Sequence, residues 1–204
     1  MEIRLFKVGR FKTNCYILFD SKHKKALIVD PGGNIDNFEN IISDYSVEYI
    51  LITHGHFDHI LCAKKYKDIT KAKIVISEAD KEFLEKDELN LSKRFLKNGF
   101  LEKFSADILV NDGDVLPFSE EFIEVISTPG HTIGSVCYKI RNVIFSGDTI
   151  FCGTYGHTGF PTGSESLMKK SLKKLYSLNV DFKIYPGHSK STLLSVERAK
   201  TTGF

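Results

Sequence analysis

Short apolar runs separated by polar residues and glycines divide the chain into alternating elements. Eight runs have the length and the β-branched content of strands: NCYILF (14–19), KKALIVD (24–30), VEYILIT (47–53), KIVIS (73–77), EFIEVIST (121–128), SVCYKI (135–140), NVIFSGD (142–148) and FKIYP (182–186). Apolar residues at helical spacing predict helices over 34–44, about 60–67 and 164–178. Another helix is expected after KIVIS, with Ser77 as its N-cap and Asp80 three positions later. Strands in each half with helices between them favour two packed sheets covered by helices, in a single domain over 1–204.

Composition and charge narrow the functional classes. The formal net charge of +2 is too small to indicate a nucleic-acid partner, and the lysines are spread over solvated faces. Charged residues interrupt the apolar ones throughout the first twenty positions. This pattern is typical of neither a signal peptide nor a membrane-spanning segment. We therefore expect a cytoplasmic protein with no membrane partner, while its oligomeric state stays open. The cysteines form no C-x-x-C pair and are expected to be buried free thiols: Cys15, Cys62, Cys137 and Cys152.

Histidines and aspartates stand at or just after the ends of several predicted strands. They are His54, His56, Asp58, His59, His131, Asp148 and His188. His54 and His56 are two residues apart, so an extended backbone points both imidazoles to the same side. A lone histidine at a strand end is usually an ordinary polar residue, and a structural zinc site closes with four ligands. Seven nitrogen and oxygen donors instead match two metal ions with three ligands each and one shared carboxylate.

Four motifs follow one another in a fixed order over nearly the whole chain. They are THGHFDH at 53–59, PGHT at 129–132, SGDT at 146–149 and PGH at 186–188. In this order they resemble the metallo-β-lactamase superfamily. The resemblance implies an α/β fold, a four-layered αβ/βα sandwich of two mixed β-sheets flanked by helices, with the site at one edge of the sheets. Asp30 matches a site-supporting aspartate of this family, although a turn residue that ends a strand is the alternative.

The resemblance also implies how the donors are shared. One metal would be bound by His54, His56 and His131, the other by Asp58, His59 and His188, and Asp148 would bridge the two. Such a pair lowers the pKa of the water held between the ions from about 15.7 toward 7, so that hydroxide exists at neutral pH and attacks a substrate carbonyl. Imidazole ligands favour zinc or iron over magnesium or calcium. We expect two divalent ions with zinc as the first choice, and iron and manganese remain open.

Asp58 and Asp148 are the predicted catalytic residues. Asp58 is expected to orient the attacking water as well as to bind metal, and the bridging Asp148 to set the geometry of the two ions. The hydroxyls of Thr53 and Thr132 are candidates for supporting the ligands, with an ordinary role at a strand end as the alternative.

Within this superfamily the chain is most similar to the glyoxalase II type, the hydroxyacylglutathione hydrolases. The likeness rests on FSGDTIFCGTYGHTGFPTGS (145–164) and on GHSKSTLLSVERAKTTGF (187–204). It implies a small-molecule substrate, a thioester such as a hydroxyacylglutathione or a related ester. A thiolate suits this chemistry because a thiol with a pKa of about 8.5 leaves without strong acid assistance.

The chain also departs from the glyoxalase II pattern. His157 and Gly159 stand where that group has arginine and aspartate, and Leu61 and Cys62 stand where it has glycines. The sequence stops soon after His188, whereas the larger members carry a further helical domain that contacts glutathione. We therefore expect a compact thioesterase or ester hydrolase, with glutathione as carrier left open. Tyr155 and His157 are the candidates for substrate contact, with loop packing as the alternative.

Other functions fit parts of the pattern. A mononuclear iron persulfide (sulfur) dioxygenase would use residues such as His54, His131 and Asp148 and would consume oxygen. A nucleic-acid processing metallohydrolase would share the ligands, but the weak charge argues against it. A regulatory protein with a purely structural metal would not need seven donors.

Overall fold

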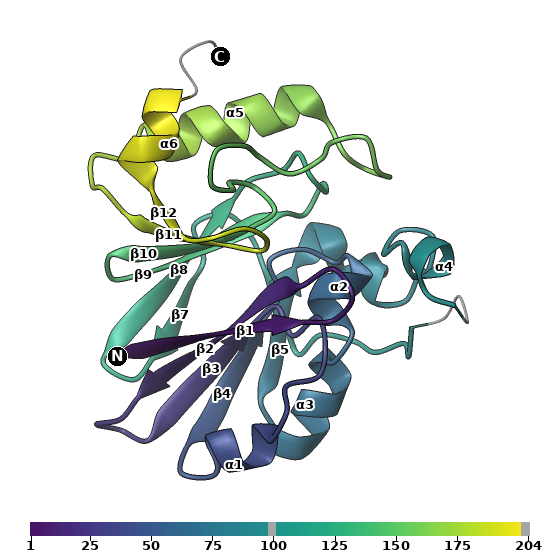
Figure 1. The fold of residues 1–204 in the computed structure, drawn as a ribbon, viewed down its shortest axis with the longest axis vertical. Helices are drawn as coiled ribbons and strands as arrows, with labels where there is room; N and C mark the ends of the chain where they lie inside the picture. The colour runs from purple at the N-terminus through teal and green to yellow at the C-terminus, as the bar shows by residue number, and fades with distance from the viewer. Residues whose placement is uncertain (98–100, 201–204) are drawn as a thin grey trace.

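The computed structural model describes residues 1–97 and 101–200 (Figure 1). The strands are β1 (Glu2–Val8), β2 (Thr13–Asp20), β3 (Lys25–Val29), β4 (Ser46–Leu51), β5 (Lys73–Ser77), β6 (Ile108–Val110), β7 (Val115–Phe118), β8 (Glu121–Ser127), β9 (Val136–Ile140), β10 (Val143–Gly147), β11 (Lys183–Pro186) and β12 (Thr192–Leu193). The helices are α1 (Phe38–Ile42), α2 (Phe57–Ile60), α3 (Ala63–Thr70), the 3-10 helix η1 (Glu78–Leu84), α4 (Ser92–Phe95), α5 (Glu165–Tyr176) and α6 (Leu194–Lys200).

The strands of the described segments form two mixed sheets whose order follows the chain. The first sheet has the order β1-β2-β3-β4-β5-β6 and the second β12-β11-β10-β9-β8-β7. Neighbours are antiparallel from β1 to β3 and parallel from β3 to β6. In the second sheet β10 and β11 are parallel, and the other neighbours are antiparallel. The expected pair of mixed sheets is confirmed.

Side chains that alternate along the strands pack one face of each sheet against helices and the opposite face against the other sheet. On β2, Ile17 belongs to the apolar core that includes α1 and α3, whereas Leu18 belongs to the core between the sheets. Every residue of β2 is buried, so both faces of the first sheet are covered. Met168 and Leu172 of α5 cover the outer face of the second sheet. Figure 1 shows the resulting layers, with α1 and α3 on one side and α5 and α6 on the other, and the four-layered α/β sandwich is confirmed.

Several helices differ from those expected. The helix predicted over 34–44 is reduced to α1, because Asn37 adopts a left-handed conformation (φ 56°) just before it. The helix predicted near 60–67 is two helices, α2 and α3, separated at Cys62. After β5 the chain forms a 3-10 helix, not an α-helix. Ser77 accepts a hydrogen bond from the Ala79 backbone as a cap, but Asp80 turns into the interior.

The four edge strands of the described sheets were not predicted from the sequence. β1 and β6 flank the first sheet, and β7 and β12 flank the second. Their burial patterns mix exposed and buried positions, because an edge strand has fewer neighbours. An apolar run is therefore not required there.

Two expectations about the chain as a whole can be compared with the structure. All four cysteines are free thiols, as predicted; Cys15 and Cys137 are buried, but Cys62 and Cys152 are only half-buried. Over residues 1–97 and 101–200, no helix combines the length and the apolar character that a bilayer crossing requires.

Candidate metal centre

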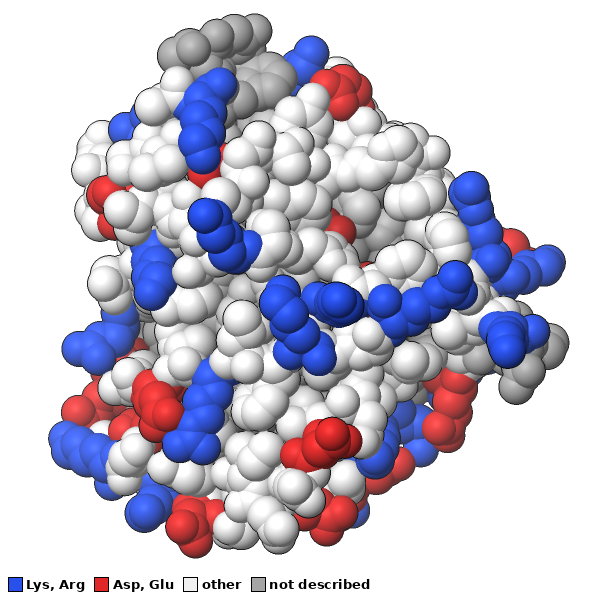
Figure 2. All heavy atoms as spheres, in the orientation of Figure 1, with Lys and Arg blue, Asp and Glu red and all other residues white. Residues whose placement is uncertain are grey.

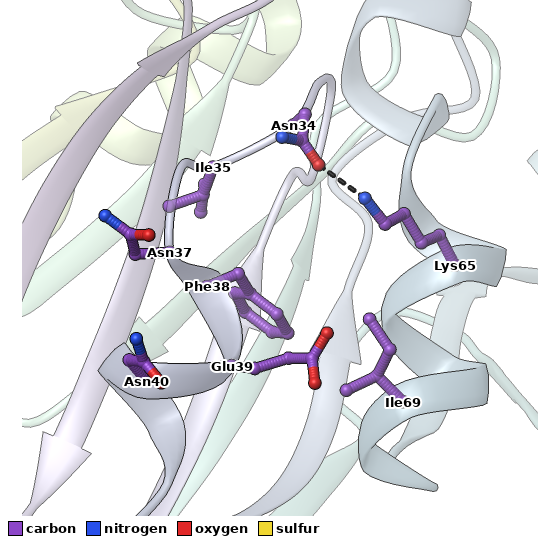
Figure 3. A pocket seen from close by; sticks show the side chains of 8 residues that line it. All are labelled: Asn34, Ile35, Asn37, Phe38, Glu39, Asn40, Lys65 and Ile69. Carbon is purple, nitrogen blue, oxygen red and sulfur yellow. Dashed lines mark hydrogen bonds between the residues drawn. The ribbon is translucent and has the colours of Figure 1, made fainter.

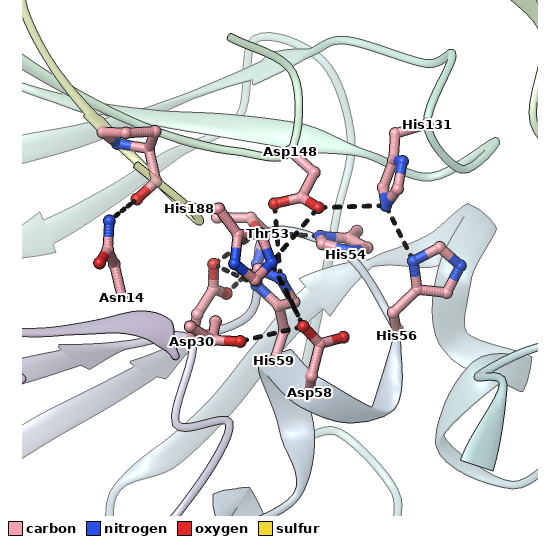
Figure 4. Close-up of polar contacts among 12 residues, drawn as sticks. Asn14, Asp30, Thr53, His54, His56, Asp58, His59, His131, Asp148 and His188 are labelled. Carbon is pink, nitrogen blue, oxygen red and sulfur yellow. Dashed lines mark hydrogen bonds and ion pairs between the residues drawn. The ribbon is translucent and has the colours of Figure 1, made fainter. Parts of the chain in front are cut away.

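The seven predicted donors come together at one edge of the two sheets. Figure 4 shows their side chains pointing toward one another across a small space. The donors come from the end of β4 (His54, His56), from α2 (Asp58, His59) and from the ends of β8, β10 and β11 (His131, Asp148, His188). Strand ends hold side chains rigidly while leaving them free to face a cleft.

The donors form two groups that share one carboxylate. The first group is His54, His56 and His131, and the second group is Asp58, His59 and His188; within each, the candidate ligand atoms lie within 4.8 Å of one another. Asp148 Oδ2 is 3.4 Å from Nε2 of His131, and Asp148 Oδ1 is 3.5 Å from Nε2 of His59. One carboxylate therefore faces both groups, as a shared ligand would.

Several buried polar atoms in these groups have no hydrogen-bond partner among the described residues. They are Nε2 of His54, His56 and His59 and Oδ1 of Asp148. Leaving such an atom buried and unpaired costs about 1–3 kcal/mol, and a cation would remove that cost for the atoms of His54, His59 and Asp148. His56 turns its other nitrogen toward its group, with Nδ1 2.9 Å from His131 Nε2. The donor set fits two divalent ions, and its imidazoles suit zinc or iron.

Asp30 orients the imidazoles of His59 and His54 from the side that faces away from the metal positions. Its Oδ2 accepts a hydrogen bond from Nδ1 of His59 (2.9 Å) and another from the Thr53 hydroxyl (2.7 Å). Because that hydroxyl donates to Asp30, it is free to accept from Nδ1 of His54, 3.2 Å away. Both imidazoles thus present Nε2 to the metal positions. The structure thus places Asp30 and Thr53 in contact with the imidazoles, as a supporting role requires.

Asp80 supports the first group, a role that the sequence analysis missed. Its buried carboxylate accepts hydrogen bonds from the Gly55 backbone (2.9 Å), the Gly134 backbone (2.8 Å) and the Thr132 hydroxyl (2.7 Å). It therefore joins the loop that carries His54 and His56 to the loop after His131. Thr132 acts through Asp80 and not on a ligand. Spacing along the chain gave no signal for this contact, because the partners are 25 to 54 positions away.

The start of β2 supports the second group in a similar way. Asn14 donates from Nδ2 to the carbonyls of Pro186 (2.8 Å) and Ser189 (2.9 Å), on either side of His188. The Thr13 hydroxyl donates to Asp58 Oδ2 at 2.9 Å. Asn14 was predicted only as the first residue of a strand, and Thr13 lies just before that predicted strand.

Charges around His59 give the second group an excess of negative potential. Burial lowers the pKa of this imidazole, but Asp58, Asp30 and Asp148 outweigh burial and raise the pKa of His59 to about 10. Burial in turn raises the pKa of Asp58, yet His59 and His188 outweigh it and hold that pKa well below its usual range. A metal ion would take the place of the His59 proton. Burial lowers the pKa of all three imidazoles of the first group, which keeps them neutral as ligands must be.

Tyr155 and His157 lie apart from the seven donors. The Tyr155 hydroxyl donates to Glu165 at 2.8 Å, and its ring packs against the core beneath α5. The His157 side chain is exposed, and its ring lies 4.8 Å from that of Phe160. The backbone carbonyl of His157 accepts the hydrogen bond from Nδ1 of His131 (2.6 Å), which fixes that ligand. Substrate contact by the two side chains remains a prediction.

A cleft of about 230 Å³ opens over the shared carboxylate. Its apolar wall consists of Phe11, Phe57, Leu91, Phe95 and Phe160, and the rest of its lining is drawn from the seven donors. The donors differ in how much of each side chain is exposed to solvent. The side chain of His188 is 27% exposed and that of Asp58 is 18% exposed, whereas that of His59 is fully buried. Both groups therefore face the cleft, and Asp58 and His188 of the second group are its most exposed donors.

A larger hollow of about 370 Å³ lies elsewhere, between α1 and α3. Figure 3 shows it lined by three asparagines, with Lys65 donating to Asn34. The seven donors do not contribute to this hollow. We assign the chemistry to the smaller cleft because the donors line it.

The fold and the donor groups define a class: a four-layered α/β protein with a candidate metal centre at the edge of its two sheets. The family model of the metallo-beta-lactamase superfamily matches residues 8–188, and the chain belongs to this superfamily. It is accordingly a metallo-hydrolase superfamily enzyme with a candidate metal-binding cluster of histidines and aspartates.

Individual relatives resemble the chain over most of its length. It is 33% identical to the hydroxyacylglutathione hydrolase GloC of Haemophilus influenzae, over 97% of this chain and 95% of the relative. It is 31% identical to a probable polyketide biosynthesis zinc-dependent hydrolase, BaeB, of Bacillus velezensis, over 86% of this chain and 72% of the relative. The crystal structure of the BLEG-1 B3 metallo-beta-lactamase superposes with a TM-score of 0.90 at 28% identity, covering 97% of each chain.

Proposed function

We propose that this protein is a metal-dependent hydrolase that cleaves a small-molecule thioester or a related ester, with two divalent ions, zinc first, held by the two donor groups. The observation that carries the proposal is the shared carboxylate of Asp148 between two complete groups, both of which contribute residues to the lining of the cleft. The likeness to a hydroxyacylglutathione hydrolase supports a thioester, and the likeness to a zinc-dependent hydrolase supports zinc.

When bound, the two ions would supply Lewis acidity, which lowers the pKa of water and polarises a carbonyl. Asp58 stays ionised because its pKa is held low, so its carboxylate orients a water by accepting a hydrogen bond. Thr13 fixes that carboxylate by donating to Oδ2. Asp30 keeps His59 in the tautomer that presents Nε2. The chain's own part in the reaction is thus to orient the water and the ligands.

The lining of the cleft supports a good leaving group. Apart from the seven donors, the lining residues are apolar, so the described cleft offers no lysine, tyrosine or cysteine to protonate a poor leaving group. A thiolate, whose conjugate acid has a pKa of about 8.5, departs without such help. A thioester therefore suits this cleft better than an amide.

An iron persulfide dioxygenase remains the alternative enzyme. It would need one ion held by residues such as His54, His131 and Asp148, and the second group would then have no function. We expect neither a nucleic-acid nor a membrane partner, and we place the protein in the cytoplasm.

A substrate panel with metal analysis on the same sample tests the proposal. The panel contains lactoylglutathione, other acyl thioesters, lactones, a β-lactam and an RNA, with oxygen uptake measured on a persulfide. We expect thioester cleavage that Asp148→Ala abolishes and that a distant control, Asp36→Ala, retains. Oxygen uptake with one iron per chain, or cleavage of RNA or the β-lactam in preference to every thioester, would contradict the proposal.

A further inference from the structure

The apolar side of the cleft is built from aromatic rings packed on one another. The Phe11 ring is 5.6 Å from that of Phe57 and 5.5 Å from that of Phe95, between ring centroids. Phe57 and Phe95 are stacked on each other at 5.9 Å. We call these three rings with Phe160 the aromatic wall. Phe57 directly precedes Asp58, so the wall begins beside the exposed donors of the second group.

Phe160 stands next to the first group. Its ring lies 5.7 Å from that of His56 and 6.3 Å from that of His131. Phe11 is 40% exposed, although a large apolar side chain is usually buried. Apolar surface thus lines the cleft from the metal positions to its mouth, and an apolar ligand group that covers this surface is stabilised by its removal from water.

Positive charge stands at the outer end of the wall. The Arg94 guanidinium carbon lies 5.2 Å from the ring centre of Phe95 and 5.9 Å from that of Phe160. Arg10 lies 5.9 Å from the ring centre of Phe11. Within residues 1–97 and 101–200 neither arginine forms an ion pair with a carboxylate, whereas the neighbouring Lys93 of α4 pairs with Glu88. Figure 2 shows Lys and Arg side chains gathered over the tip of the β1–β2 hairpin and around α4.

The structure assigns to this cleft a thioester with an apolar alkyl or aryl acyl group and an anionic carrier. The acyl group packs on the aromatic wall beside the reacting carbonyl, and the carboxylate or phosphate of the carrier is bound by Arg94 and Arg10. The carrier faces the mouth because the leaving thiol has to depart toward solvent. This inference rests on the proposed hydrolase function and adds the substrate class.

The test compares substrates that differ in one part at a time. Phenylacetyl and lactoyl thioesters are each prepared on 3-mercaptopropionate and on its neutral amide. We expect the kcat/KM of the zinc-loaded enzyme to be about tenfold or more higher for phenylacetyl than for lactoyl, because the wall receives the ring. We expect the anionic carrier to be favoured about threefold or more, and this preference to fall as salt is added.

Variants separate the two parts of the site. Phe11→Ala should reduce the acyl preference but not the carrier preference, and Arg94→Gln the reverse. Phe122→Ala, at a side chain 64% exposed on β8, and Lys170→Gln, on the solvent face of α5, are the matched controls and should change neither preference. Equal kcat/KM for both acyl groups or for both carriers would overturn the inference. So would an Arg94→Gln enzyme with an unchanged carrier preference.

A binding measurement keeps the inference testable if no thioester is cleaved. The thioether S-(2-phenylethyl)-3-mercaptopropionate cannot be hydrolysed, and calorimetry measures its affinity for the metal-loaded protein. We expect it to bind about tenfold more tightly than the corresponding S-(2-hydroxyethyl) compound, with the affinity weakened by both Phe11→Ala and Arg94→Gln. Tight binding without turnover would refute only the proposed function, whereas equal affinity for the two thioethers would refute the inference.

Discussion

Three of the five imidazoles of the centre are fixed through the nitrogen that a metal would not use. Asp30 holds His59, Thr53 holds His54, and the backbone of residue 157 holds His131. The donors themselves could be predicted, because each follows an apolar run in a recurring motif. Their supports could not be, because a carboxylate such as Asp80 reaches partners that only the folded chain brings near.

Removing the shared carboxylate tests the arrangement at a single residue. In Asp148→Ala both groups lose their common ligand, so we expect turnover to fall roughly 1000-fold or more, on the scale of the several kcal/mol that metal ions contribute. The far-ultraviolet circular dichroism spectrum should match that of the wild type, because within the described residues the Asp148 side chain forms ion pairs only with histidines of the two groups. Retained hydrolysis in Asp148→Ala, with Asp36→Ala as the exposed control, would refute the shared-ligand mechanism.

Asp80→Asn tests the support of the first group. An amide nitrogen cannot accept the hydrogen bonds that one carboxylate oxygen receives from Gly55 and Thr132. We expect a loss of about 2–4 kcal/mol in the free energy of unfolding, measured by urea denaturation of the metal-free protein. We also expect weaker zinc binding in a competition titration with a chelator. The nearby exposed variant Glu78→Gln should leave both quantities unchanged; equal stability of the two variants would remove Asp80 from its supporting role.

At the scale of elements, the central strands were predictable and the edges were not. β5 was predicted with its observed bounds, since KIVIS is buried on both faces of a parallel sheet. The N-terminal strand β1 alternates apolar and charged residues, with only Val8 fully buried, and gave no such run. The start of β2 has a second task, because Asn14 fixes the loop that follows β11.

Asn14→Ala should weaken one metal position and spare the other. Without its two hydrogen bonds the loop around His188 is no longer held against β2, whereas the first group has its own support in Asp80. We expect a zinc titration to show two steps, of which one weakens by about 10- to 100-fold. Asn40→Ala, at an exposed asparagine of α1, serves as the control. Uniform weakening of both steps would mean that the loop supports the centre as a whole.

At the scale of the molecule, the metal centre joins the two sheets. The first group takes His54 and His56 from the β4 end and His131 from the β8 end, so its ligands come from both sheets. The second group likewise combines α2, which follows β4 of the first sheet, with His188, which follows β11 of the second. The layers of sheets and helices could be predicted from the order of the elements along the chain. That these loops lie close together could be predicted only from the sequence motifs.

Metal removal should therefore loosen the packing of the sheets. An ion at one hundred times its dissociation constant stabilises a protein by about 2.7 kcal/mol. For a chain of this length we expect chelation to lower the melting temperature by roughly 5–10 °C, measured by calorimetry, and added zinc to restore it. A melting temperature that chelation leaves unchanged would show that the donors do not bind ions in the folded protein.

The most direct test of the central claim is the number of metal ions bound per chain. Elemental analysis of protein saturated with zinc and freed of excess metal, with the protein quantified by amino-acid analysis, should give two ions per chain. His188→Ala should lower the number to one, because the second group loses a ligand while the first stays complete. A wild-type value of one, unchanged in His188→Ala, would contradict the paired metal centre.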